Sequence, residues 1–499
     1  MLKINQLTIS HIKDSKPIIA DLNLIIKPGE KLAIIGEEGT GKSTLLQAIA
    51  NSQTLTNYAT LQGQIDNRFK KIAYLPQSLA ENEKRQTISD FLYKDINPFF
   101  NYNAFYQMSA LLHLDLSTLE KKNQSLISLS GGERIKLQLA KLTGQDPDLF
   151  LLDEPSSDLD IESQDILKQF IQKTDKTVIF ISHDEVMLKD TATAILHLEL
   201  IRHRQIPRAC YFHGNYHDYL ELRHKAFTKQ YEEAKNDRRL KQKRDEKIQR
   251  LYQAAQHNVR HTHDSTLGRL AAKKMKNVLS LEKRYQKEDE TITEFPEKMD
   301  SITLFFHDIS PLNYKKRLLS WHNHMLSTGQ TIDLDIFGQD KIVITGKNGI
   351  GKSQLLRQIY QELDKNEQLS IGYMPQDYDN ILKGDISAVS FLSEVTTDKT
   401  ARTILASLQF TRDEMEHRVI ELSGGQKAKL FLAHMVLAKN QVIILDEPTR
   451  HFSPTSQPII RQLLRDYPGC IISVSHDQNF INCVAKTHYQ LTNHSLRRY

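Results

Sequence analysis

Cysteine and long apolar stretches are scarce in this chain of 499 residues. The three cysteines, Cys210, Cys470 and Cys483, show no paired spacing, so we expect neither a disulfide framework nor a zinc site. Apolar runs such as residues 178–181 are far shorter than the ~18 residues that a membrane span requires. The first residues, MLKINQLTIS, contain no apolar core of signal-peptide length. We therefore expect a cytoplasmic protein without membrane segments.

The charge of the chain is small but unevenly distributed. Hydrophobic residues make up 39% of the sequence, which supports buried cores and excludes wholesale disorder. Of the net charge of +5, residues 221–290 contribute +8, with 19 Lys and Arg against 11 Asp and Glu, so the remainder carries −3. A basic middle between mildly acidic ends predicts contact between the middle and a polyanion, and the alternative is a solvated helical surface.

Two glycine-rich stretches repeat one motif. Residues 36–43 read GEEGTGKS and residues 346–353 read GKNGIGKS, each after a short apolar run and before a helical pattern. In this context, backbone N–H groups and a helix N-terminus are suited to hold nucleotide phosphates, and the lysines neutralise phosphate oxygens. The expected nucleotide-binding residues are Gly36, Glu37, Glu38, Gly39, Thr40, Gly41, Lys42, Ser43 and Thr44, and Gly346, Lys347, Asn348, Gly349, Ile350, Gly351, Lys352, Ser353 and Gln354. Acidic side chains beside phosphates are unusual, so we expect Glu37 and Glu38 to point away from them.

A second set of motifs also occurs twice, at matched intervals. Residues 129–133 read LSGGE and residues 422–426 read LSGGQ; from each serine it is 24 residues to a glutamate and 53 to a histidine. Each glutamate follows an aspartate at the end of an apolar stretch, and each histidine ends another. These residues are Ser130, Gly131, Gly132, Asp153, Glu154 and His183, and Ser423, Gly424, Gly425, Asp446, Glu447 and His476. The identical spacing predicts one domain that has been duplicated.

Together these motifs resemble those of ABC-type ATPases with two nucleotide-binding domains on one chain. The resemblance implies an α/β, P-loop NTPase fold, ATP and Mg²⁺ as cofactors, and head-to-tail pairing that joins Lys42 to Ser423 and Lys352 to Ser130. Glu154 and Glu447 would polarise the attacking water, while His183 and His476 would bond the γ-phosphate. The expected Mg²⁺ ligands are Ser43, Ser353, Gln77, Gln376, Asp153 and Asp446, with Gln77 and Gln376 in the sequences AYLPQ and GYMPQ.

The two halves differ in the loop after the catalytic glutamate. The first half keeps Asp160 at the position where this family has a domain-crossing aspartate, whereas the second half has Ser453 there. This difference and the two acidic residues of the first phosphate loop argue against assuming equal turnover at the two sites.

The segment between the halves is predicted to be a helical hairpin. It opens with YFHGNYHDYL at residues 211–220, and residues 215–267 contain no glycine or proline. Apolar residues recur at helical steps on both sides of a polar break at residues 261–266, and Pro296 ends the second helix. We therefore expect a first ABC domain at 1–205, a basic hairpin linker at 206–299 with its tip at about 256–268, and a second ABC domain at 300–499.

Basic residues gather around the predicted tip, where residues 250–276 contain one acid, Asp264. Such clusters bind nucleic-acid phosphates. The candidate RNA contacts are Arg250, His257, Val259, Arg260, Leu267, Arg269, Lys273, Lys274 and Lys276.

Twin ATP-binding domains with such a linker resemble the ABC-F family of ribosome-associated ATPases. The resemblance implies a monomer with two intramolecular ATP sites, which enters the tRNA exit site of the ribosome and contacts large-subunit rRNA and P-site tRNA. The short first-domain insertion and the absence of an extra arm are similar to members that protect ribosomes from antibiotics. The alternatives are a housekeeping ABC-F translation factor that relieves stalled ribosomes, an ATPase subunit of a transporter, and a DNA-bound ABC ATPase.

Overall fold

The chain forms two compact units in a computed structural model that describes residues 1–12, 15–94, 96, 98–122, 124–201, 206–260, 265–289, 293, 295–296, 309–378, 382 and 386–499. The first unit comprises Met1–Tyr216 and Met299–Tyr499, and the second comprises His217–Lys298. The first unit contains two α/β domains, and the second is helical. In the part of the chain that is described, no helix is both long enough and apolar enough to cross a membrane.

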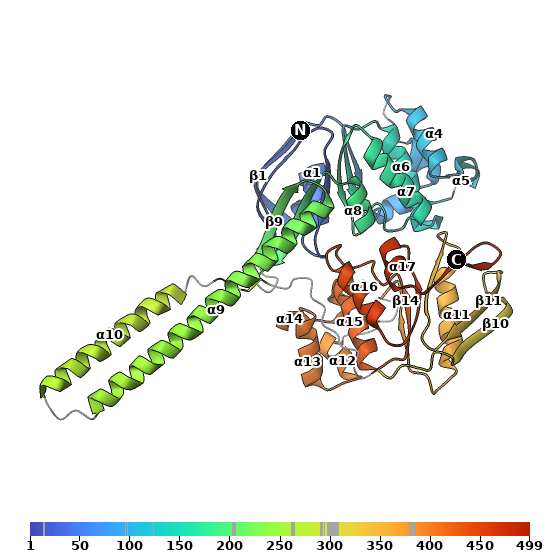
Figure 1. Cartoon of the computed structure of the whole chain (residues 1–499). Helices are drawn as coiled ribbons and strands as arrows, with labels where there is room; N and C mark the ends of the chain where they lie inside the picture. The colour runs from blue at the N-terminus through green and yellow to red at the C-terminus, as the bar shows by residue number, and fades with distance from the viewer. Residues whose placement is uncertain are drawn as a thin grey trace. The chain divides into compact units, whose positions relative to one another are not determined.

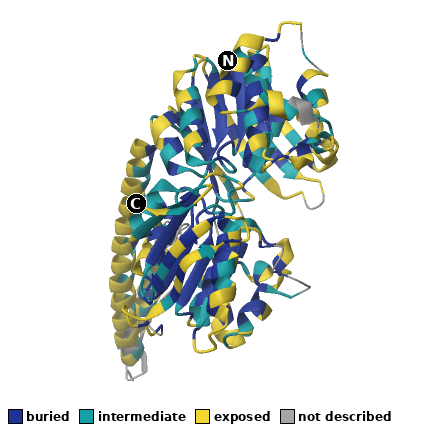
Figure 2. Ribbon diagram, turned by 90° about the vertical axis from the view of Figure 1, so that its right-hand side faces the viewer, coloured by how far each residue is buried: buried dark blue, intermediate teal, exposed yellow. Residues whose placement is uncertain are grey.

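A six-stranded sheet is the centre of the first domain. Its order is β5-β6-β7-β3-β8-β9, with parallel pairing except between β8 and β9. Every residue of β3, β6 and β7 is buried, as expected for parallel strands with both faces covered (Figure 2). The strands are β3 (Lys31–Ile35), β5 (Ile72–Leu75), β6 (Leu149–Asp153), β7 (Thr177–Ile181), β8 (Ala194–Ile201) and β9 (Ile206–His213).

A smaller antiparallel sheet, ordered β2-β1-β4, completes the first domain, and its strands share an apolar cluster with β3 and α1. Its strands are β1 (Leu2–His11), β2 (Pro17–Ile26) and β4 (Ala59–Asn67). The helices, with η for a 3₁₀-helix, are α1 (Lys42–Ala50), η1 (Ser52–Asn57), α2 (Glu81–Lys84), α3 (Ile88–Tyr93), α4 (Tyr102–Leu111), α5 (Leu116–Lys122), η2 (Leu126–Ser128), α6 (Gly131–Gly144), α7 (Ile161–Lys173) and α8 (Glu185–Thr191).

The second domain repeats this architecture. Its six-stranded sheet has the order β13-β14-β15-β12-β16-β17, in which each strand corresponds to one of the first sheet, and β10 pairs with β11 in a smaller sheet. The strands are β10 (Arg317–Met325), β11 (Thr331–Phe337), β12 (Lys341–Gly346), β13 (Ile371–Met374), β14 (Val442–Asp446), β15 (Cys470–Val474), β16 (Thr487–Leu491) and β17 (Leu496–Arg498). The helices are α11 (Lys352–Asp364), α12 (Ala388–Ser393), α13 (Asp398–Ser407), α14 (Arg412–Glu416), η3 (Val419–Glu421), α15 (Gly424–Leu437), α16 (Gln457–Asp466) and α17 (Gln478–Val484). The predicted tandem α/β fold is therefore confirmed.

Two helices make up the second unit. Helix α9 (Tyr216–Arg260) has 45 residues, about 70 Å at 1.5 Å per residue. Helix α10 (Ser265–Asp289) has 25 residues and lies alongside it (Figure 1). The Arg244 guanidinium lies over the ring of Tyr285 at 5.3 Å, which joins the two helices. Residues 261–264 of the predicted tip lie outside the described residues.

The end of the hairpin away from the tip is held by the segment that follows α10. The ring of Phe295 lies 5.3 Å from that of Tyr231, and the Arg238 guanidinium lies over the Phe295 ring at 4.3 Å. The backbone N–H of Thr293 donates to Asp237 Oδ2 at 3.0 Å. Phe295 therefore fastens this segment onto α9.

Candidate nucleotide-binding sites

Both glycine-rich loops lie between a buried strand and a helix. Gly41 and Gly351 precede α1 and α11 with φ of 88° and 101°, a left-handed conformation that glycine adopts without strain. The Nζ of Lys42 donates to the carbonyl oxygens of Gly36 and Glu37, at 2.8 Å each. Lys352 makes the equivalent bonds to Gly346 and Lys347, at 2.9 and 3.0 Å. Each ammonium group is thus held over its own loop, where burial lowers its pKa.

An aspartate ends the strand beside each loop. Asp153 and Asp446 are buried, and each carboxylate accepts a hydrogen bond from the loop serine, Ser43 or Ser353. Burial raises the pKa of Asp153 to about 6, and its Oδ1 has no hydrogen-bond partner.

These oxygen atoms fit Mg²⁺. A carboxylate oxygen without a partner and an adjacent hydroxyl are ligands of the type that Mg²⁺ prefers. Among the described residues, no group of three or more His, Cys, Asp or Glu is arranged to hold a metal. The set therefore suits an ion that takes most of its ligands from phosphate and water.

The glutamates after these aspartates adopt a rare backbone conformation. Glu154 and Glu447 have φ of 49° and 52°, while their N–H groups continue the sheet pairing to Ile181 and Val474. Left-handed geometry in a residue with a side chain is costly and is found mostly at functional sites. Here it turns each carboxylate towards the histidine that follows the neighbouring strand.

The two glutamate–histidine pairs differ in electrostatics. Glu154 Oε1 lies 3.3 Å from His183 Nε2, and Glu447 Oε1 lies 3.8 Å from His476 Nε2. Although burial opposes it, the charge and hydrogen bond of His183 lower the pKa of Glu154 to about 2. Burial and the Asp446 charge raise the pKa of Glu447 to about 7, while burial and Lys352 lower the pKa of His476 to about 3.

The SGGE and SGGQ motifs begin helices α6 and α15 as capping boxes. Ser130 Oγ accepts the N–H of Glu133 at 3.2 Å, and Glu133 Oε2 accepts the N–H of Ser130 at 2.9 Å. Ser423 and Gln426 form the same reciprocal pair, at 3.3 and 3.0 Å. The serine and the residue three positions later thus fix a helix N-terminus, whose free N–H groups attract anions.

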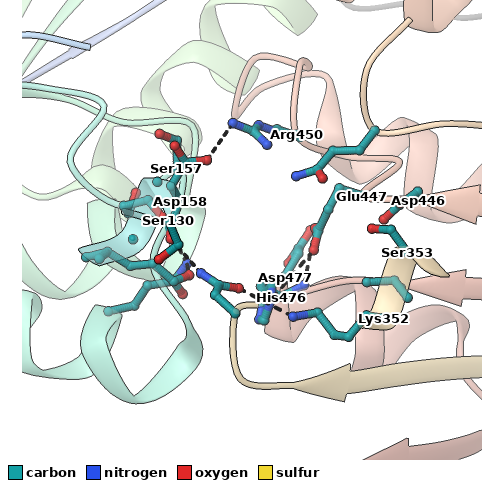
Figure 3. Close-up of a pocket in the computed structure, with 18 of the residues that line it drawn as sticks. Ser130, Ser157, Asp158, Lys352, Ser353, Asp446, Glu447, Arg450, His476 and Asp477 are labelled. Atoms are coloured by element: carbon teal, nitrogen blue, oxygen red, sulfur yellow. Dashed lines mark hydrogen bonds and ion pairs between the residues drawn. The ribbon is translucent and has the colours of Figure 1, made fainter. Parts of the chain in front are cut away.

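One pocket of about 570 Å³ brings together residues predicted for the second site (Figure 3). From the first domain it is lined by the start of α6 and by Glu154 and His183. From the second domain the predicted residues that line it are Asn348, Gly349, Gly351, Lys352, Ser353, Gln354, Gln376, Asp446, Glu447 and His476. The structure therefore places Lys352 opposite Ser130, in the arrangement expected for head-to-tail domains.

Two residues that the sequence analysis did not single out, Asp158 and Arg450, connect the domains at this pocket. The Arg450 guanidinium donates to Asp158 Oδ1 at 2.8 Å (Figure 3), and Asn348 Nδ2 donates to the carbonyl oxygen of Asp158 at 2.5 Å. The divergence of the loops that follow the two glutamates was a signal that could have identified Asp158 and Arg450.

The first composite site contains a small pocket beside Glu38. The pocket between its phosphate loop and the start of α15 has about 20 Å³ and is lined by Glu37, Glu38, Ser423 and Gly425, among others. Glu38 Oε2 accepts the N–H of Gly425 at 2.9 Å, and its Oε1 lies 3.2 Å from His451 Nδ1. The side chain of Glu38 thus points towards the opposite domain.

Ser453 occupies the position of Asp160 and makes the same local contact. Asp160 Oδ1 accepts the N–H of Ser163 at 3.0 Å, and Ser453 Oγ accepts the N–H of Ser456 at 3.3 Å. The Ser453 hydroxyl therefore stabilises the turn before α16 in the same way as the Asp160 carboxylate stabilises the turn before α7.

Arg461 makes a buried contact between the domains that the sequence analysis missed. Its NH2 donates to both oxygens of Glu185, at 3.0 and 2.8 Å, and its NH1 lies 3.5 Å from Asp477 Oδ2. Glu185 follows His183 by two residues, and Asp477 follows His476 by one, so one guanidinium group contacts the loops after both histidines. A lone arginine on an amphipathic helix gives no sequence signal for this role.

Gln77 and the candidates on the hairpin are not among the residues that line these pockets. Gln77 is exposed and does not line either pocket. On the hairpin, the exposed candidates are Arg250, His257, Arg269, Lys273, Lys274 and Lys276. The side chains of Val259, Arg260 and Leu267 lie outside what the structure describes.

Comparisons with known proteins agree with this geometry. The family model described as ABC transporter matches residues 19–157 and 329–450, more than half of the chain. ABC transporter F family member 5 of Arabidopsis thaliana is 26% identical over 522 residues, covering 93% of this chain and 71% of the relative. The ribosome protection protein VmlR of Bacillus subtilis (strain 168) is 27% identical over 507 residues, covering 98% and 86%.

A solved structure shares the fold over nearly the whole chain. It is the crystal structure of the complex of archaeal ribosomal stalk protein aP1 and archaeal ribosome recycling factor aABCE1, with a TM-score of 0.63 and 17% identity. The match covers 99% of this chain and 89% of that one. With duplicated sheets, paired phosphate loops and matching family models, the chain belongs to the ABC family and contains ABC-type ATPase domains. Within that family it is an ABC-F ATP-binding protein with two ABC domains.

Proposed function

We propose that this protein binds ATP with Mg²⁺ at two composite sites between its domains and uses the hydrolysis of ATP to control binding to the ribosome. The observation that carries the nucleotide part is the pocket of about 570 Å³, in which the capped N-terminus of α6 faces Lys352 and Glu447. Anion-binding groups from two domains around one pocket suit a phosphate chain whose binding closes the domains.

In the proposed mechanism, each group acts according to its position. The lysines neutralise phosphate oxygens, and Ser43, Asp153, Ser353 and Asp446 hold Mg²⁺ directly or through water. When bound there, Mg²⁺ would neutralise negative charge of the phosphates. Glu154 and Glu447 orient water, and the adjacent histidines bond the terminal phosphate. Gln77 and Gln376 complete the set in this proposal.

The hairpin supports the ribosomal part of the proposal. Its unit is basic and largely exposed, and Lys273, Lys274 and Lys276 all lie exposed on α10. A relative of similar length is named a ribosome protection protein, and the structural neighbour is named a ribosome recycling factor. We infer that the protein acts in the cytoplasm as a monomer, entering the tRNA exit site with its hairpin towards P-site tRNA and large-subunit rRNA near the peptidyl-transferase centre.

Protection of the ribosome from bound antibiotics is the role we favour. The described helices between Gln77 and Ser130 have at most 10 residues, so they form no extended arm. A housekeeping factor that relieves stalled ribosomes is the alternative. Drug susceptibility of cells with and without the protein separates the two, because only a protective factor raises the inhibitory concentration.

Charge reversal on the hairpin tests the ribosomal part. The triple variant Lys273→Glu, Lys274→Glu, Lys276→Glu is expected to weaken co-sedimentation with ribosomes at least ten-fold and to flatten its salt dependence, because phosphate contacts are lost. The matched control is Lys225→Glu, Lys229→Glu, Lys235→Glu, an equal charge change near the start of α9, which should bind nearly as the parent does. If the parent and the triple variant bind ribosomes equally well, these lysines of α10 form only a solvated surface and do not contact the ribosome.

A further inference from the structure

The anion-binding end of α15 already holds a carboxylate. Helix α15 has 14 residues, Ser423 caps it, and Gly425 is its second residue. The Gly425 N–H, one of the groups that an α-helix leaves without an internal partner, donates to Glu38 Oε2 at 2.9 Å. Glu38 lies in the phosphate loop of the opposite domain, so the contact spans the first composite site.

The second site lacks this arrangement. Asn348 occupies the loop position that corresponds to Glu38, and its amide donates to the Asp158 carbonyl oxygen instead. The pocket of about 570 Å³ is lined by Asn348 and Lys352 but also by Glu154 and His183, and a second pocket of about 20 Å³ lies between Glu38 and the start of α15. At corresponding positions of the two phosphate loops, a carboxylate therefore contacts the opposite signature helix and a neutral amide does not.

The residue that faces Glu38 has changed in a matching way. His451 corresponds to Asp158 in the loop after the glutamate, and its Nδ1 lies 3.2 Å from Glu38 Oε1. An aspartate there would repel Glu38, whereas a histidine can donate to it. Although burial opposes it, His451 and the Gly425 N–H lower the pKa of Glu38, which favours the carboxylate form. Glu38 and His451 thus form a complementary pair at the first site, and Asn348 and Asp158 form a different pair at the second.

We propose that Glu38 is a built-in anion for the signature helix α15, so that the first composite site accepts a nucleoside diphosphate in preference to a triphosphate. A terminal phosphate held by the first loop would face α15 and compete with Glu38 for the same N–H group. Its negative charge would also be repelled by the carboxylate. A diphosphate leaves the Glu38–Gly425–His451 contact in place. This inference rests on the proposed function, since it assumes that both loops bind nucleotide, and it narrows that proposal by assigning the preference for ATP to the second site.

The test measures nucleotide binding at the first site alone by equilibrium dialysis of the full chain with radiolabelled ATP or ADP and Mg²⁺, without ribosomes. Lys352→Ala removes the second site, and this chain is expected to bind ADP at least ten-fold more tightly than ATP. Adding Glu38→Asn introduces the residue found at this position of the second loop. It should raise the affinity for ATP at least ten-fold and abolish the preference for ADP. The reason is that the hydrogen bond between the Glu38 carboxylate and Gly425, and the repulsion between that carboxylate and the terminal phosphate, are both removed.

Glu367→Gln in the Lys352→Ala chain is the control, since it removes one exposed carboxylate charge outside both phosphate loops and leaves the Gly425 contact, and it should retain the preference for ADP. Thermal unfolding of each variant checks that the fold is kept. Equal affinities for ATP and ADP in the Lys352→Ala chain, unchanged by Glu38→Asn, would overturn the inference. The double variant Lys42→Ala, Lys352→Ala should bind neither nucleotide. If this double variant still binds nucleotide, the two nucleotide-binding sites are wrongly assigned. That outcome is distinct from loss of the preference for ADP over ATP.

Discussion

At the residue scale, Glu154 and Glu447 have equivalent backbones but unlike surroundings. Both hold left-handed φ at the end of a buried strand. Both line the pocket of about 570 Å³, but Glu38 of the phosphate loop that Glu154 serves accepts a hydrogen bond from the opposite signature helix, whereas Asn348 of the loop beside Glu447 donates to Asp158. Identical motifs therefore do not imply identical chemistry.

Glu447→Gln is accordingly expected to lower steady-state ATP hydrolysis by about 100-fold or more, the range for loss of a general base. Glu154→Gln should cause a loss several-fold smaller, because a first site that prefers a diphosphate, as proposed above, would contribute little turnover. Phosphate release under saturating ATP measures both. Equal losses in the two single variants would show that the sites turn over alike.

The motif residues could be predicted from the sequence because spacing alone distinguishes them. The cross-domain partners could not, since Glu38 and His451 are separated by 413 positions and meet only through the packing of the domains. The acidic residues in the phosphate loop were a visible anomaly, but the direction in which their side chains point depends on how the two ATPase domains pack.

At the element scale, helical periodicity and the absence of glycine and proline predict α9, yet its first residue and its length depend on packing. Tyr216 begins the helix fully buried in the first unit, and the helix continues to Arg260. The attachment of the segment after α10 was not predictable, because one aromatic ring in a polar stretch gives no periodic signal.

Phe295→Ala is expected to release that segment from α9, because the ring contacts with Tyr231 and Arg238 are lost. The Thr293 amide should then exchange its hydrogen at least several-fold faster, whereas amides in β6 keep their protection. Hydrogen exchange followed by mass spectrometry measures this. Phe295→Leu is the milder control, and unchanged exchange in Phe295→Ala would contradict the assigned anchor.

At the scale of the whole molecule, one buried guanidinium group joins the two ATPase domains beside both histidines. The Arg461 side chain is 8% exposed and that of Glu185 5%. Removing one member of a buried ion pair leaves a desolvated charge and costs about 3–5 kcal/mol.

Arg461→Met should therefore lower the stability of the paired domains by about that amount and weaken the coupling between the sites. Lys cannot form the bidentate contact, so Arg461→Lys should give an intermediate loss. Chemical denaturation measures the stability, and the ATP dependence of hydrolysis measures the coupling. A stability close to that of the parent in Arg461→Met would contradict this role.

The central claim is that nucleotide binding at the paired domains controls attachment to the ribosome. The most direct measurement is co-sedimentation of the double variant Glu154→Gln, Glu447→Gln with purified ribosomes in ATP and in ADP. The account predicts stable attachment with ATP and none with ADP, since the closed state can no longer be released by hydrolysis. Absence of attachment with ATP, in a chain that still binds the nucleotide, would contradict it.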